Sequence, residues 1–442
     1  MNKSRRKFIN KSGKIIAGTG MVSAVPMASI IAGNKIMGAN DKVIVGLVGC
    51  NGMGFANLQN FLNQPDIECG MMCDVDQNVL DRRTSEVEKK FNQSPVKVKD
   101  YRKVIDNKDI DVVIVGTPDH WHCLPTVEAC EAGKDVYCEK PLANTIQELD
   151  IMVKAARKYD RVVQVGQWQR SGPHWLEAID YVYSGKLGNI RTVKTWAYQG
   201  WMKPVPVVPD SPVPEGVDYD FWLGPAPKRP FNKNRFHFSF RWFWDYAGGL
   251  MTDWGVHIID FGLFGMKAQA PKSVMASGGK FAYPDDASET PDTLQAIYEF
   301  DGFTMIWEHA TGINGGPYGR DHGVGFIGNN GTLVVDRGGW EVIPEKSNGK
   351  DKMEAIPYRK GKGGDLELHV QNFLACMKTR EKPNCDIAIA ANTARVAHLG
   401  NIAYKTGKKV YWDKAKNEFI NDREANELTK ATYRNPWVLP KV

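Results

Sequence analysis

A glycine-rich turn near residue 50 constrains the fold of this 442-residue chain more than any other feature. Residues 42–48 form a β-branched run that predicts a buried strand, and the turn after it reads Gly49-Cys50-Asn51-Gly52-Met53-Gly54. An amphipathic helix is expected next, because four apolar side chains fall on one face: Phe55, Leu58, Phe61 and Leu62. A strand, a glycine turn and a helix in this order predict a parallel α/β sheet of the Rossmann type.

The same turn predicts what this fold binds. Glycines let the backbone approach a pyrophosphate, and the first turn of a helix offers free N–H groups and the positive end of the helix dipole. One departure exists, since Asn51 replaces the middle glycine of the G-x-G-x-x-G pattern and Gly52 is displaced by one position. We expect the whole turn to contact a dinucleotide: Gly49, Cys50, Asn51, Gly52, Met53 and Gly54.

An acidic residue after the second strand indicates which dinucleotide is bound. The strand expected over Ile67–Cys73 ends at Asp74, which lies 20 residues past Gly54. A carboxylate at that spacing accepts hydrogen bonds from the adenosine ribose hydroxyls and repels a 2′-phosphate, which favours NAD over NADP. Asp-Val-Asp before a helix is also typical of a helix N-cap, so a capping role for Asp74 stays open as the alternative.

Polar residues follow three further expected strands. Residues 112–115 lead into Thr117-Pro118-Asp119-His120-Trp121-His122, residues 135–137 into Cys138-Glu139-Lys140-Pro141, and residues 162–166 into Gln167-Trp168-Gln169-Arg170. In open parallel sheets, ligands bind at the carboxyl ends of the strands. We therefore expect one group to face the cofactor, namely Thr117, Pro118, His122, Glu139, Lys140 and Gln167. His122 is equally well explained as a structural histidine. We expect Gln169 and Arg170 to face the substrate.

Two residues in the second half suit proton transfer. Asp253 and His257 are four residues apart, so on a helix they share one face. An alcohol that loses a hydride to NAD must also lose a proton, and an imidazole is a suitable base near neutral pH. Asp253 can orient the imidazole or hold a neighbouring hydroxyl, and Lys140 can hold the alkoxide. The alternative for His257 is a buried structural histidine.

Together these motifs resemble the Gfo/Idh/MocA family, named for glucose–fructose oxidoreductase and inositol dehydrogenase. The motifs are the glycine turn, Thr117-Pro118-Asp119…His122, Glu139-Lys140-Pro141, and Gly248-Gly249…Asp253-Trp254-Gly255-Val256-His257, in order over residues 41–412. The resemblance implies an α/β fold with an N-terminal Rossmann domain and a C-terminal α/β domain with a large, mainly antiparallel open sheet. It also implies NAD(P)-dependent redox chemistry on sugars, polyols or their derivatives. Lys140 is then the catalytic lysine, Asp253 contacts the substrate, and His257 transfers the proton.

We expect four parts along the chain. They are an export leader at 1–40, the Rossmann domain at 41–165, a substrate and oligomerisation domain at 166–414, and a polar tail at 415–442. Within the second domain, helices at 366–405 should pack back on the core, and hairpins are expected at Asp301-Gly302 and Asn329-Asn330-Gly331. Residues 199–246 form an insertion rich in proline and aromatic residues. Most of its rings should pack the loop, and Trp201 and His237 are expected to contact substrate.

The leader suggests export. Arg5-Arg6-Lys7-Phe8-Ile9 resembles a twin-arginine signal, and a mildly apolar run over 15–32 follows it. The alternative is a disordered basic tail. Without a clean cleavage site, the leader can stay on as a membrane tether, and we expect a periplasmic protein. Residues 1–40 hold seven lysines and arginines and no acid. The net charge of the whole chain is +6, so the remaining residues together carry a net charge of −1. That balance removes the case for nucleic acid.

We therefore expect an NAD-dependent oxidoreductase acting on a hydroxyl of a sugar, glycoside or polyol, with glycoside C3 oxidation as one such reaction. Outside the cytosol there is no free NAD pool, so the cofactor should stay tightly bound and be recycled. One alternative is an NAD-dependent glycosidase, although the presence of Glu139-Lys140-Pro141 argues against it. A non-catalytic sugar-binding protein is another. We expect no metal site, eight reduced buried cysteines, and a homo-oligomer, either dimer or tetramer, as in the family.

Overall fold

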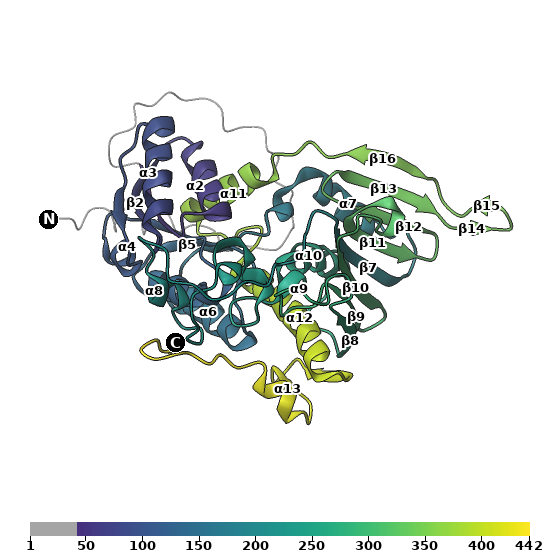
Figure 1. Cartoon of the computed structure of the whole chain (residues 1–442). Coiled ribbons are helices and arrows are strands. Elements are labelled where there is room, and N and C mark those ends of the chain that lie inside the picture. Colours follow the sequence, from purple (N-terminus) through teal and green to yellow (C-terminus); the bar gives the residue numbers. More distant parts are fainter. Residues whose placement is uncertain (1–41) are drawn as a thin grey trace, which may run out of the picture.

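A computed structural model of the protein describes residues 42–442, so the leader predicted at 1–40 lies outside the described residues. Figure 1 shows two sheets that lie beside each other. The first is entirely parallel, with strand order β3-β2-β1-β4-β5-β6. Its strands are β1 (Val43–Val48), β2 (Ile67–Cys73), β3 (Val96–Val98), β4 (Val112–Val115), β5 (Asp135–Cys138) and β6 (Val163–Val165). This order confirms the predicted Rossmann domain, whose strand order reverses between β1 and β4.

The helices of the first domain connect these strands. They are α2 (Gly52–Leu62), α3 (Gln77–Phe91), α4 (Arg102–Asp106), α5 (Cys123–Glu131) and α6 (Ile146–Lys158), with a 3-10 turn, η1 (Asp119–Trp121), after β4. The apolar face predicted for α2 is buried, at Phe55, Leu58, Phe61 and Leu62. Amphipathic patterning therefore located this helix and its orientation correctly.

Three glycines form a close backbone crossing where α2 meets the sheet. A Cβ atom on Gly54 would lie 2.1 Å from the carbonyl oxygen of Gly49, and one on Gly116 would lie 2.4 Å from Cα of Gly54. Gly49 also has a φ of 87°, which disfavours other residues. The crossing therefore requires glycine at all three positions, and it holds the first turn of α2 against the ends of β1 and β4.

The second sheet has ten strands in the order β16-β13-β12-β11-β7-β10-β9-β8-β17-β18. Their bounds are β7 (Ile190–Gln199), β8 (Ser273–Gly279), β9 (Thr293–Glu299), β10 (Thr304–Thr311), β11 (His322–Gly328), β12 (Gly331–Val335), β13 (Gly339–Pro344), β16 (Ile356–Lys360), β17 (Val410–Asp413) and β18 (Glu418–Phe419). Every pair is antiparallel except β7 and β10. The predicted hairpins join β9 to β10 and β11 to β12. Beyond the main sheet, β14 (Lys346–Ser347) and β15 (Lys350–Asp351) form a short ribbon.

Helices cover one face of this sheet and tie it to the first domain. They are α7 (Pro173–Tyr183), α9 (Gly249–Asp253), α10 (Gly255–Met266), α11 (Asp365–Thr379) and α12 (Ile387–Thr406). Helix α11 returns to the Rossmann domain, where the ring of Phe373 lies 5.8 Å from that of Phe61 in α2. Helix α12 packs between α6, α10 and β8. The two domains therefore share continuous apolar packing.

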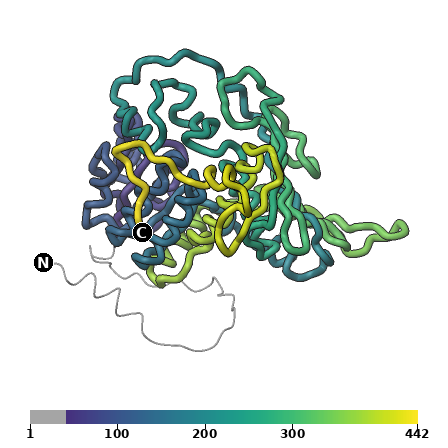
Figure 2. The backbone as a smooth tube through the Cα atoms, turned by 90° about the horizontal axis from the view of Figure 1, so that it is seen from below, coloured from purple at the N-terminus to yellow at the C-terminus, as the bar shows by residue number. Residues whose placement is uncertain are grey.

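The segment after residue 414 differs from the polar tail that we expected. It contains β18 and α13 (Arg423–Glu427), and it then crosses to the first domain, as the yellow tube in Figure 2 shows. The Tyr433 hydroxyl donates a hydrogen bond to Glu148 Oε1 at 2.7 Å. The Trp437 ring lies 4.8 Å from that of Trp121. The polar composition misled us because two aromatic side chains anchor the whole segment.

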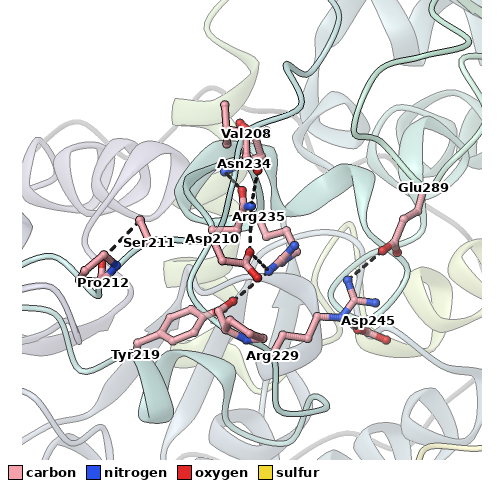
Figure 3. A network of polar contacts seen from close by, with 12 residues as sticks. Val208, Asp210, Ser211, Pro212, Tyr219, Arg229, Asn234, Arg235, Asp245 and Glu289 are labelled. Atoms are coloured by element: carbon pink, nitrogen blue, oxygen red, sulfur yellow. Dashed lines mark hydrogen bonds and ion pairs between the residues drawn. The ribbon is translucent and has the colours of Figure 1, made fainter.

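The insertion at 199–246 forms a small core of its own. It contains α8 (Tyr219–Leu223), η3 (Lys233–Arg235) and η4 (His237–Trp242), packed around rings that include Tyr219, Trp222 and Tyr246. Figure 3 shows the polar network that fastens it. Arg235 lies 3.2 Å from Asp210, and Arg229 pairs with Asp245 at 2.6 Å and Glu289 at 2.8 Å. Glu289 lies outside the insertion, so this network ties the loop to the second domain.

Candidate functional site

A pocket of about 360 Å³ opens at the carboxyl ends of β1, β4 and β5. One wall is formed by the glycine turn and the polar strand ends, and the other by the insertion. The residues we predicted for the cofactor that line it are Gly49, Asn51, Gly52, Met53, Asp74, Thr117, Pro118, Glu139 and Lys140. The insertion adds Phe221, Trp222, Phe236, His237, Phe238, Phe240 and Arg241.

The first wall fits a dinucleotide. Gly52 has no atom within 4 Å of the position where a Cβ would lie, so a ligand can approach the backbone there. The buried hydroxyl oxygen of Thr117 has no hydrogen-bond partner in the protein, which leaves it for a ligand. The start of α2 supplies N–H groups for a pyrophosphate. These three observations fit the cofactor predicted from the sequence.

Asp74 is fixed in the pocket by two backbone groups. The N–H of Cys50 donates to one carboxylate oxygen at 2.8 Å, and the N–H of Asp76 donates to the other at 3.0 Å. Burial raises the pKa of Asp74, and these two hydrogen bonds oppose that rise. The helix cap is Asp76, whose side chain accepts from the N–H of Asn78 at 2.9 Å. The capping alternative for Asp74 is therefore wrong, and its ribose contact stays a prediction.

Lys140 and Asp253 meet at the other end of the pocket. Lys140 Nζ donates to Asp253 Oδ1 at 2.6 Å and to the Asp253 carbonyl at 2.9 Å. Arg241 Nε donates to the same Oδ1 at 3.2 Å. Burial raises the pKa of Asp253, but Lys140 and Arg241 outweigh it and hold that pKa at about 2. A permanently charged carboxylate therefore orients the lysine toward the pocket.

His257 is a neutral imidazole beside this pair. Its side chain is buried, and its Nδ1 has no hydrogen-bond partner in the described chain. Burial lowers the pKa of His257 well below its usual value, and the nearby charges of Lys140 and Arg337 lower it further. The helix we expected over Asp253 and His257 is broken, because α9 ends at Asp253 and α10 begins at Gly255. A neutral imidazole can accept a proton, which fits the predicted role.

Asp119 and Arg241 are among the pocket residues that the sequence reasoning missed. Asp119 is buried in η1 and lines the pocket, and burial raises its pKa to about 8 against the opposing charges of Arg241 and Lys140. It is therefore protonated at neutral pH. Its place in the Thr117-Pro118 motif was the available signal. Arg241 had none, because nothing local connects it with Asp253.

Several predicted site residues instead hold the structure together. His122 is fully buried, with Nδ1 2.7 Å from the Pro141 carbonyl and Nε2 2.9 Å from the Thr117 carbonyl. It fixes the loops around Lys140, as the structural alternative expects, and neither ring nitrogen is free to bond a cofactor. Arg170 is also buried and pairs with Asp260 through Nε at 2.6 Å and Nη2 at 2.9 Å, which engages its guanidinium within the protein.

Three other residues predicted to contact the cofactor do not line the pocket, and His237 lines it at a different end from the one expected. Cys50 gives its N–H to Asp74, and Gly54 is covered at the backbone crossing. Gln167 is buried and accepts from the Cys385 thiol at 3.2 Å. His237 lies at the Asp74 end, with Nε2 3.0 Å from Asp76 Oδ2, rather than beside Lys140 as a substrate contact would require. None of Cys50, Gly54 or Gln167 lines the pocket.

Two substrate predictions remain open. Gln169 is fully buried, and neither side-chain amide atom has a hydrogen-bond partner in the described protein. Trp201 is 57% exposed, and its ring lies 6.1 Å from that of Phe238 at the edge of the pocket. An unsatisfied amide and an exposed indole are both suited to a sugar.

Residues 42–442 were also compared with what we expected for cysteines and metal ligands, and searched for membrane-spanning helices. All eight cysteines are free and buried, as expected for reduced core thiols. Within these residues, no group of three or more His, Cys, Asp or Glu side chains is placed to hold a metal ion. No helix in the same range has both the length and the apolar character needed to cross a bilayer.

A Rossmann domain joined to an open ten-stranded sheet, with a lysine and an aspartate at the shared pocket, defines a two-domain dinucleotide-binding protein. The chain belongs to the Gfo/Idh/MocA oxidoreductase family. Residues 43–167 match the family's "NAD-binding Rossmann fold" and residues 189–439 match its "C-terminal alpha/beta domain". The match confirms the predicted family, fold class and NAD-binding domain.

Curated relatives include a glycosyl hydrolase family 109 protein of Shewanella putrefaciens, 28% identical over 204 residues. They also include an alpha-N-acetylgalactosaminidase of Shewanella oneidensis, 27% identical over 204 residues. Each match covers 43% of this chain and 44% of the relative, so the chain matches less than half of their length.

Solved structures with the same fold include levoglucosan dehydrogenase in complex with NADH and levoglucosan, with a TM-score of 0.64 and 20% identity. Another is aldose-aldose oxidoreductase from Caulobacter crescentus complexed with glycerol, with a TM-score of 0.63 and 20% identity. Each alignment covers 84% of this chain and 99% of the other. At this identity the likeness establishes the fold.

Proposed function

We propose that this protein is an NAD-dependent oxidoreductase acting on a hydroxyl group of a sugar, glycoside or polyol. The observation that carries the proposal is Lys140, held by Asp253 at the end of a dinucleotide pocket beside the neutral imidazole of His257. Bound NAD supplies the hydride acceptor. Relatives and structural neighbours that are named for sugar substrates support the choice of substrate class.

The side chains divide the remaining work among them. The substrate hydroxyl donates its proton to His257, which is unprotonated at neutral pH. Lys140 donates a hydrogen bond to the oxygen as negative charge develops on it. Asp253 stays ionised and orients Lys140, and its second oxygen is available to a neighbouring hydroxyl. The hydrogen bonds to the substrate oxygen strengthen as its proton leaves, and the alkoxide that they stabilise releases hydride more readily than the alcohol does.

We also propose that the cofactor is retained and recycled. The insertion fastens across the Asp74 end of the pocket, where Asp218 N–H donates to the Val75 carbonyl at 2.9 Å and Gln77 N–H to the Gly216 carbonyl at 3.1 Å. The contact between His237 and Asp76 adds a third fastening. A covered dinucleotide leaves slowly, and oxidation of one sugar must then be balanced by reduction of a second. Glycoside C3 oxidation is the reaction we favour.

Retention suits the location that the leader suggests. We propose that the twin-arginine-like residues Arg5 and Arg6 direct the folded, loaded protein to the periplasm, where the leader either is removed or tethers it to the membrane. We also propose a homo-oligomer formed through the open sheet. Met275 on β8 and Ile297 on β9 are each 43% exposed and support this interface.

The decisive experiment is to denature the purified protein and identify any released nucleotide by mass spectrometry. Close to one NAD per chain supports retention. Intact protein is then mixed with single sugars and glycosides while the absorbance of NADH is followed. Protein that carries no nucleotide, and that reduces no added NAD with any of these compounds, contradicts the proposal.

A second candidate is NAD-dependent glycoside cleavage, which the named activities of the Shewanella relatives favour. In that reaction a sugar hydroxyl is oxidised to a ketone, the acidified neighbouring proton and the glycosidic oxygen leave, water adds, and the hydride returns. Aryl glycosides distinguish the two reactions. Cleavage releases the aryl alcohol without net NADH and introduces solvent deuterium beside the oxidised carbon. Simple oxidation leaves the glycosidic bond intact.

A further inference from the structure

An arginine from the open sheet lies close enough to His257 to lower its pKa, and the proposed function gives it no contact with the substrate. Arg337 lies in the turn between β12 and β13. Its guanidinium carbon is 4.6 Å from the ring centroid of Trp168 and 4.4 Å from that of Trp254. The same two indoles lie 5.9 Å and 6.4 Å from the ring of His257. The Arg337 guanidinium and the imidazole of the proposed base, His257, therefore pack against the same two indoles.

This guanidinium lacks a counter-ion. Among residues 42–442 it forms no ion pair, and its Nε is buried without a hydrogen-bond partner. Asp253, Asp365 and Asp321 act on it only through longer-range attraction. By contrast, Arg170 is paired with Asp260 and Arg241 with Asp253. A partly buried cation without a partner carries a desolvation cost, and a ligand that supplies negative charge offsets that cost.

The surrounding charges also favour an anion. Lys140 and Arg241 share the single carboxylate of Asp253. Asp119 is uncharged at neutral pH, and so is His257. Burial lowers the pKa of Arg337 to about 10, which still leaves it charged at neutral pH. Three cations, Lys140, Arg241 and Arg337, therefore lie around Asp253 and His257. None of the nearby acids, Asp253, Glu139, Asp365 and Asp321, forms an ion pair with Arg337.

We propose that the substrate is an acidic sugar, a hexuronic acid or its glycoside, whose carboxylate binds Arg337 while a ring hydroxyl reaches Lys140 and His257. The planar fork of a guanidinium matches a carboxylate through two parallel hydrogen bonds. The two indoles fix the plane of the fork, and the unpartnered Nε is one of its donors. This inference rests on the proposed function, because it names the substrate class of the same site.

The test compares matched acidic and neutral sugars on the protein with its bound nucleotide. Glucuronate is paired with glucose and galacturonate with galactose, each also as the methyl glycoside. Reduction of the bound NAD in a single turnover, measured at several sugar concentrations, gives the second-order rate constant that stands for kcat/KM. Titration calorimetry gives binding independently of turnover. We expect the acid of each pair to be preferred by about 10-fold or more, the scale of a hydrogen-bonded charge pair.

Variants of Arg337 locate the preference. Arg337→Met keeps an unbranched side chain between the indoles and removes the donors, so we expect kcat/KM for the acids to fall about 10- to 100-fold with little change for the neutral sugars. Arg337→Lys should restore only part of the loss, since an ammonium lacks the fork. Arg359→Met is the matched control, because Arg359 also stacks on a tryptophan, 5.0 Å from the ring of Trp340. Nucleotide content and thermal unfolding verify that each variant folds.

The outcomes separate the two proposals. If neutral sugars are preferred, or if Arg337→Met weakens both classes equally, the acidic-sugar inference is wrong while the oxidoreductase function stands. If calorimetry detects acid binding that depends on Arg337 but no sugar reduces NAD, the oxidoreductase function is wrong and the acidic ligand stands. If sugar phosphates bind and uronates do not, the carboxylate assignment is overturned.

Discussion

The two ends of the pocket are built in different ways. At the Asp74 end, the wall comes from a contiguous strand, turn and helix, and backbone N–H groups hold the key carboxylate. At the Lys140 end, the wall is assembled from side chains that lie far apart in the sequence, including Lys140, Arg241 and Asp253. The first end is suited to a fixed cofactor, and the second can change its side chains without disturbing the fold.

The largest expected effect concerns Lys140. Replacing it with methionine should lower kcat by about 10³-fold, because the developing oxygen charge loses its donor. Released nucleotide, measured by mass spectrometry, should remain near the wild-type level, because the other end of the pocket is untouched. Unchanged turnover in Lys140→Met would place the chemistry elsewhere, and full loss of NAD would show that the two ends are not independent.

His257 gives the next largest effect. His257→Gln should lower kcat/KM by about 10²-fold, as expected for loss of a general base. Because the pKa of His257 lies well below 6.5, the imidazole stays unprotonated as the pH falls through 6.5. We therefore expect kcat/KM of the wild-type protein to stay level through that range. A decline centred near 6.5 would mean that the base has an ordinary pKa.

Asp74 tests the cofactor end alone. Asp74→Ser removes the acceptor for the ribose hydroxyls and the charge that repels a 2′-phosphate, so NAD affinity should fall about 10-fold and NADP should become usable. We expect kcat with saturating NAD to change by less than about 3-fold. Fluorescence titration of nucleotide-free protein with both cofactors measures the shift. A variant that still rejects NADP would indicate another source of selectivity.

The last prediction concerns the pH dependence of stability at Asp119, which is measured separately from turnover. Its folded pKa is about 8 against an ordinary 3.8, so the unfolded chain ionises it first as the pH rises. Below pH 3.8 its contribution favours the folded state fully, and this contribution is lost as the pH rises to about 8. Relative to Asp119→Asn, the wild-type free energy of unfolding should therefore decrease between these values. Urea unfolding of the nucleotide-free wild type and variant at several pH values measures the two free energies. If both depend on pH in the same way, the raised pKa of Asp119 is contradicted.

The sequence predicted the parts of the molecule that depend on nearby residues. The glycine turn, the apolar face of α2 and the two hairpins each follow from a few adjacent positions, and all three occur in the structure. The resemblance, rather than spacing, put Lys140 and Asp253 in one predicted site, and the two side chains lie 2.6 Å apart.

Contacts between distant segments explain what was missed. The buried ion pair of Arg170 with Asp260 spans 90 residues, so no local pattern separates it from a substrate contact. His237 is held by Asp76 from the opposite domain, 161 residues away. Arg337 has no local signal either, because its position between two indoles depends on how the sheet packs against the first domain.

The anchored segment around Trp437 affects the order of events during synthesis. Its ring packs 4.8 Å from Trp121 and 5.2 Å from Phe221, and both of these side chains line the pocket. The strands of the first domain leave the ribosome early. Trp121 and Phe221, however, can pack against Trp437 only after residue 437 has emerged. This wall of the pocket is therefore complete only once residue 437 has been made and has folded back onto the first domain.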